Sequence, residues 1–148
     1  MTSQFPILLV DDDPTIADVL NRVAQTSFAE ARFNHVSSFE EAVAYLENLD
    51  GKGPKLILLD INLPHREEGL HFLTRLRDHP QGRLVPVVIL SATELPQQLR
   101  KAYNLGASVC TTKPFDYPGW KAYVRQLRTY WFNTVTVPNL RFEKETDD

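Results

Sequence analysis

The stretch that decides the fold is ILLVDDD at residues 7–13, where a short apolar run ends abruptly in three aspartates. Two other runs have the same character: residues 56–60 are LILLD, and residues 85–91 are VPVVILS. None of them alternates between apolar and polar residues, which is typical of strands covered on both faces of a parallel sheet. Residues 32–36 and 108–112 are weaker strand candidates.

Helices are predicted in the intervals between these strands. The first begins at Asp13-Pro14, an N-cap followed by proline, and the second begins at Ser38, which forms a capping box with Glu41. A third is stopped before residue 80, and a fourth covers residues 96–105. The fifth carries an apolar stripe at helical spacing, made by these residues: Trp120, Val124, Leu127 and Trp131.

Five strand-helix pairs in succession predict a doubly wound α/β sandwich of the flavodoxin-like (βα)5 kind. We expect a parallel sheet with its strands in the order 2-1-3-4-5. One domain is expected over residues 1–132. Residues 133–148 are expected to form a C-terminal extension with a disordered acidic tip, since residues 141–148 are mostly charged.

Composition excludes several classes of protein. The 148 residues include 16 Lys and Arg against 19 Asp and Glu, a net charge of −3, so no basic excess indicates nucleic-acid binding. The apolar runs are much shorter than the roughly 20 residues that span a bilayer. The N-terminus does not resemble a secretory signal, and the lone Cys110 cannot form an internal disulfide. A soluble, cytoplasmic protein is expected.

Polar residues at the strand ends indicate the chemistry. Ligands of doubly wound sheets bind beyond the carboxyl ends of the strands. With strands one and three adjacent, the carboxylates of Asp11, Asp12 and Asp60 converge there, while Ser91 and Lys113 follow the last two strands. Like charges at contact range are unfavourable unless a cation lies between them. Carboxylates without His or Cys nearby favour Mg²⁺ or Mn²⁺.

Four motifs in order, LLVDDD, LILLDINLP, VVILSAT and TTKPF, resemble those of the response regulator receiver domain, and the match covers residues 5 to about 132. The resemblance implies that Asp60 accepts a phosphoryl group from a phosphohistidine of a sensor histidine kinase. It implies that Lys113 holds a phosphoryl oxygen and that the Ser91 hydroxyl binds another after transfer.

The same resemblance implies a Mg²⁺ site. Asp12, Asp60 and the backbone carbonyl of Asn62 would be ligands, and Asp11 would act through a bound water. Asp13 is expected to serve only as a helix N-cap, and the four histidines are expected to be ordinary surface or partly buried residues.

Two features depart from the family pattern. Cys110 stands three positions before Lys113, where receivers usually carry an aromatic residue that rotates on phosphorylation. We expect Cys110 to pack as a small hydrophobe. The loop at residues 65–69 is one residue longer than usual, so its shape beside the site is expected to differ.

The C-terminal sequence suggests partners. YWFNTVTVP at residues 130–138 resembles the extension of small response regulators associated with phytochrome-type histidine kinases. By that resemblance we expect a homodimer through the helix from Trp120 to Trp131 and the extension. The 16 residues after residue 132 leave no room for a DNA-binding output domain, so signalling is expected through protein contacts.

Two alternative functions remain. One is a Mg²⁺-dependent phosphohydrolase, which would also use a strand-end aspartate as nucleophile. Such enzymes usually place a second aspartate, their general acid, where this chain has Asn62. The other is a receiver-like binding module that acts without phosphorylation.

Overall fold

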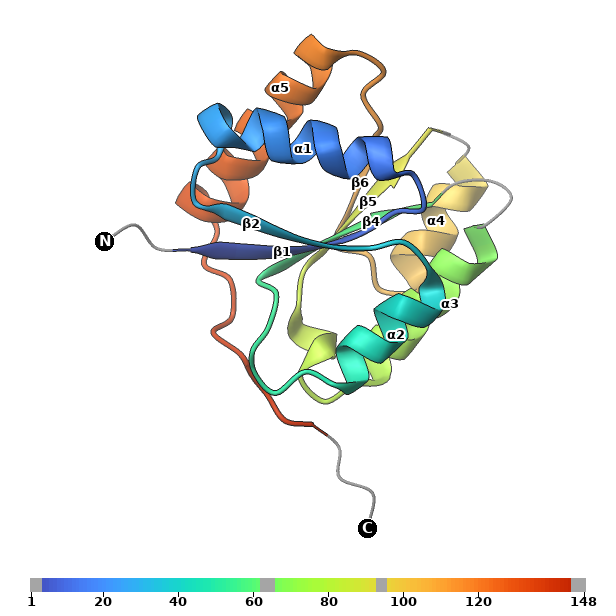
Figure 1. Ribbon diagram of the computed structural model, residues 1–148. Helices are drawn as coiled ribbons and strands as arrows, with labels where there is room; N and C mark the ends of the chain where they lie inside the picture. The colour runs from blue at the N-terminus through green and yellow to red at the C-terminus, as the bar shows by residue number, and fades with distance from the viewer. Residues whose placement is uncertain (1–3, 62–65, 93–95, 145–148) are drawn as a thin grey trace.

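The computed structural model describes residues 4–61, 66–92 and 96–144, without the side chains of residues 66–68. Its centre is a five-stranded parallel sheet in the order β2-β1-β4-β5-β6 (Figure 1). The sheet strands are β1 (Phe5–Val10), β2 (Ala31–Val36), β4 (Leu56–Asp60), β5 (Val87–Ser91) and β6 (Val109–Thr112). The predicted order 2-1-3-4-5 is confirmed, because β3 is a short extra strand outside this sheet.

Helices cover both faces of the sheet, as the sandwich prediction requires (Figure 1). On one face lie α1 (Pro14–Ser27) and α5 (Tyr117–Leu127), and on the other lie α2 (Phe39–Glu47), α3 (Arg66–Asp78) and α4 (Pro96–Asn104). No helix within the described ranges is both long and apolar enough to cross a bilayer.

Two hydrophobic cores result, one on each face. Successive strand residues point to opposite faces, so Ile7 and Leu9 enter the core with α1 and α5, and Leu8 and Val10 enter the core with α2 and α3. All four are at most 7% exposed. Burial on both faces explains why these strands are uniformly apolar.

The helix starts follow the predicted capping chemistry. The Asp13 carboxylate accepts from the backbone N–H of Thr15 at 3.0 Å, which confirms its role as an N-cap. The Ser38 hydroxyl accepts from the backbone N–H of Glu41 at 3.1 Å. The Glu41 carboxylate, however, accepts from the N–H of Ser37 at 2.6 Å, one residue before the cap. Of the two hydrogen bonds of a capping box, the one accepted by Glu41 therefore comes from Ser37 instead of Ser38.

The aromatic stripe of α5 belongs to the core. Trp120 and Trp131 are 4% and 8% exposed, and both pack in the α1–α5 core. Beyond Leu127 the chain continues as a π-helical segment, Arg128–Thr134, and within it Tyr130 stays 51% exposed. Both tryptophans of the helix that was expected to form a homodimer interface are therefore covered by the same chain, and the homodimer itself stays a prediction.

The C-terminal extension folds back onto the domain. Val135 and Val137 pack against the α1–α5 core, and β7 (Arg141–Phe142) pairs antiparallel with β3 (Gly51–Lys52). Phe142 is 1% exposed in the opposite core. The first two residues of the charged run are therefore paired in a strand, because the Phe142 ring fills a buried site. Residues 145–148, the expected acidic tip, lie outside the described residues.

Candidate functional site

Three carboxylates meet at one edge of the sheet, as predicted. Val10 pairs with Leu59 across the parallel strands β1 and β4, so the residues that follow, Asp11 and Asp60, leave the sheet side by side. One carboxylate oxygen from each of Asp11, Asp12 and Asp60 lies within 4.8 Å of the other two. Asp11 is buried at 2% exposure, whereas Asp12 faces solvent. The cluster is thus buried at Asp11 and reaches solvent at Asp12.

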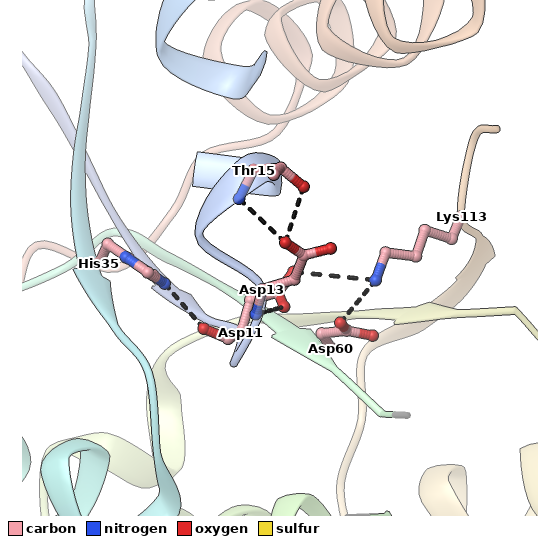
Figure 2. A network of polar contacts seen from close by, with 6 residues as sticks. All are labelled: Asp11, Asp13, Thr15, His35, Asp60 and Lys113. Atoms are coloured by element: carbon pink, nitrogen blue, oxygen red, sulfur yellow. Dashed lines mark hydrogen bonds and ion pairs between the residues drawn. The ribbon is translucent and has the colours of Figure 1, made fainter. Parts of the chain in front are cut away.

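Lys113 reaches this cluster from β6 (Figure 2). Its Nζ donates to Asp60 Oδ2 at 2.6 Å and lies 3.9 Å from Asp11 Oδ2. The side chains of Lys113 and Asp60 are 14% and 1% exposed, so their ion pair is shielded from water. The backbone N–H of Lys113 donates to the Ser91 carbonyl at 2.9 Å, which fixes the lysine to the end of β5.

Asp11 is the most constrained member of the site. Its Oδ1 accepts from the backbone N–H of Asp13 at 2.8 Å, and its own N–H donates to the Val36 carbonyl at 3.1 Å. The His35 ring contacts the Asp11 carbonyl oxygen, with Nε2 at 2.7 Å. Sequence reasoning gave His35 no role. The available signal was its place near the end of the strand that pairs with β1.

The pKa of Asp11 is raised from its ordinary 3.8 to about 7, mainly by burial and in addition by the negative charge of Asp60. The hydrogen bond from Asp13 and the positive charge of Lys113 lower this pKa but do not offset the burial. Within the described part of the chain, Asp11 Oδ2 is buried without a hydrogen-bond partner.

These features fit a hard divalent cation. A buried carboxylate oxygen that accepts no hydrogen bond is available as a ligand, and the donor set consists of oxygen atoms alone. Beside the cluster is a cavity of about 170 Å³, lined in part by Asp12, Asp60, Ser38 and Phe39. It gives small groups access to the carboxylates.

The remaining predicted residues have different outcomes. Ser91 is the last residue of β5 and is 3% exposed. Because the preceding Leu90 pairs with Asp60, Ser91 lies next to the acidic cluster. Asn62 lies outside the described residues, so its carbonyl as a metal ligand stays a prediction. The same holds for the loop at residues 65–69, which is described only in part.

Cys110 packs in part against the α2–α3–α4 core, as expected of a small hydrophobe. Burial raises the pKa of its thiol, so the Cys110 thiol is harder to ionise to the reactive thiolate. Its backbone N–H donates to the phenol oxygen of Tyr103 at 3.0 Å. An aromatic side chain therefore reaches the edge strand β6 from α4, although position 110 itself has none.

Comparisons with known proteins show which family the chain resembles. A family model described as the response regulator receiver domain matches residues 7–125. The response regulator Rcp1 of Synechocystis is 27% identical over 136 residues, which cover 89% of this chain and 92% of that protein. The probable methanogenesis regulatory protein FilR2 of Methanothrix harundinacea is 28% identical over 130 residues, covering 86% of this chain and 83% of that protein.

Two solved structures have the same fold. The phosphorylated cyanobacterial phytochrome response regulator RcpA superposes with a TM-score of 0.82 at 27% identity, covering 93% of this chain and 100% of that one. The Mn²⁺-bound form of Rcp1 has a TM-score of 0.76 at 27% identity, covering 90% and 99%. With its acidic cluster, its lysine and a family match over most of its length, the chain belongs to the response regulator receiver domain family.

Proposed function

We propose that this response regulator accepts a phosphoryl group on Asp60 from a phosphohistidine of a sensor histidine kinase and signals through contacts with other proteins. The observation that carries the proposal is the 2.6 Å contact between Lys113 Nζ and Asp60 Oδ2 inside a cluster of three carboxylates. A cytoplasmic location is part of the proposal.

The transfer is a displacement at phosphorus. An Asp60 carboxylate oxygen attacks the phosphorus atom, the phosphorus–nitrogen bond breaks, and its electron pair returns to the imidazole of the donor. Lys113 is placed to hold a phosphoryl oxygen, because its ammonium already lies against Asp60. Ser91, at the end of the next strand, would hydrogen-bond a second oxygen after transfer.

Mg²⁺ is the proposed cofactor. Asp12, Asp60 and the Asn62 carbonyl would hold it directly, and Asp11 would do so through a water. When bound, the ion neutralises negative charge on the transferring group. The buried, unbonded oxygen of Asp11 supports a cation here, and the Mn²⁺-bound form of Rcp1 is a related case.

A phytochrome-type kinase is the proposed phosphodonor. RcpA is a cyanobacterial phytochrome response regulator, and the chain is similar to it over 93% of its length. The homodimer also stays a proposal, now without the tryptophans. On the surface of α4, β6 and α5 the exposed Tyr103 is the better candidate contact, and sedimentation of wild type and Tyr103→Ala tests it.

Phosphorylation is tested with acetyl phosphate and Mg²⁺, followed by intact-mass analysis. Wild type should gain one acid-labile phosphoryl group, Asp60→Ala should gain none, and Asp18→Asn, an exposed aspartate on α1, should behave as wild type. Labelling of Asp60→Ala at the wild-type rate contradicts the assignment. An unlabelled wild type favours the phosphorylation-independent module, and rapid continuous phosphate release favours the phosphohydrolase.

A further inference from the structure

We infer that His35 is a positioning residue for the acidic site, and that its hydrogen bond to the main chain of Asp11 sets the affinity of the cluster for a divalent cation. This inference rests on the proposed metal site and adds a residue to it from β2, a strand that supplies none of the three carboxylates.

The contact continues the pairing of β1 with β2 beyond the end of β1. Val10 pairs with Val36, and the N–H of Asp11 donates to the Val36 carbonyl at 3.1 Å. The next acceptor along the chain, just after β1, is the Asp11 carbonyl, and the His35 ring reaches it with Nε2 at 2.7 Å. A carbonyl oxygen can only accept, so Nε2 carries the proton and donates it.

This bond acts on two carboxylates together. The Asp11 carbonyl and the Asp12 N–H belong to one planar peptide group. Fixing the direction of that carbonyl therefore fixes the plane from which both the Asp11 and the Asp12 side chains project. Since the Asp11 side chain is also held by the Asp13 N–H at 2.8 Å, little rotational freedom remains at this residue.

The direction of the bond also fixes how the Asp11 peptide is oriented. In the view of Figure 2, His35 and Lys113 approach Asp11 from opposite sides. The negative end of the Asp11 peptide dipole therefore points at an N–H donor on β2. Without that donor the Asp11 carbonyl loses the bond that fixes its direction, and the shared orientation of the two carboxylates is held less tightly. Loss of a partner that orients a metal ligand commonly lowers metal affinity by about 10- to 100-fold.

The test measures Mn²⁺ binding by calorimetry in wild type and variants of the full chain. His35→Leu removes the donor and should weaken Mn²⁺ binding about tenfold. His35→Gln, whose amide N–H can replace Nε2–H, should restore most of the affinity. The matched control is Asn34→Leu, the neighbouring exposed residue of β2, whose amide contacts Tyr45 of α2 at 3.4 Å. This control should bind Mn²⁺ as wild type does.

Unfolding in EDTA accompanies each measurement, so that loss of fold is not mistaken for loss of affinity. If His35→Leu does not fold, His35→Asn replaces it, because the shorter amide cannot reach the Asp11 carbonyl. Equal affinity in wild type and the folded donor-less variant overturns the inference and leaves the metal site intact. Equal losses in His35→Gln and His35→Leu overturn it as well. A wild type that binds no Mn²⁺ overturns the metal site and the inference together.

Discussion

The raised pKa of Asp11 predicts an unusual dependence of stability on pH in the absence of metal. The folded protein holds the Asp11 proton up to a pKa of about 7, whereas the unfolded chain releases it near 3.8. Between these values the folded state binds more protons than the unfolded state. This contribution to stability is therefore fully present below pH 3.8 and is lost as pH rises through 7.

The difference corresponds to at most ~4 kcal/mol, with a slope of about 1.4 kcal/mol per pH unit inside the window. Other groups titrate as well, so the perturbation is Asp11→Asn, which is neutral at every pH. The free energy of unfolding is measured by urea titration from pH 5 to 8 in EDTA, for wild type and for Asp11→Asn. Wild type should lose stability relative to the variant with increasing pH.

Mg²⁺ should reverse the trend, because it binds the deprotonated cluster of the folded state. At 100 times its dissociation constant an ion that binds only the folded state adds about 2.7 kcal/mol. The gain in wild type should increase with pH. Parallel curves for wild type and Asp11→Asn in EDTA would refute the reasoning, since Asp11 would then ionise as an ordinary carboxyl.

Three further predictions concern contacts elsewhere in the fold. Phe142→Ala should lower the free energy of unfolding, measured by urea titration, by about 3–5 kcal/mol, because a buried ring is lost. Arg141 is exposed, so the control Arg141→Ala should change it by less than about 0.5 kcal/mol. Arg77→Met should lower the free energy of unfolding by several kcal/mol, because the Arg77 guanidinium donates to four backbone carbonyls. The control Arg75→Met breaks only an exposed ion pair and should lower it by about 0–1 kcal/mol. Burial raises the pKa of Tyr123 from its ordinary 10.0 to about 12, so part of the tyrosine absorbance should change only near pH 12 in a spectrophotometric titration.

The sheet and the acidic cluster were predictable because local signals and one geometric rule suffice for them. Apolar runs that end in Asp11, Asp60 and Ser91 locate the strand ends, and parallel pairing brings these ends to one edge. The N-cap at Asp13 was likewise predictable, because it depends only on neighbouring residues.

The pairing of the C-terminal extension and the burial of the two tryptophans within the same chain were not predictable in this way. The pairing of Arg141–Phe142 with Gly51–Lys52 joins segments about 90 residues apart, and a two-residue strand carries no periodicity. At Trp120 and Trp131 an amphipathic stripe indicates a covered face but not whether the same chain or a second copy covers it. The structure shows that α1 and the sheet do so.

The charges at the site explain why its pH dependence and its metal affinity are one property. Among the described residues, the carboxylates of Asp11, Asp12 and Asp60 lie together against the ammonium of Lys113. If all of them ionise, two negative charges remain in a partly buried site. A proton on Asp11 removes one of these charges, and a divalent cation removes both. Proton and cation are therefore alternatives at the same cluster, and either one offsets the cost of burying the Asp11 charge beside Asp60.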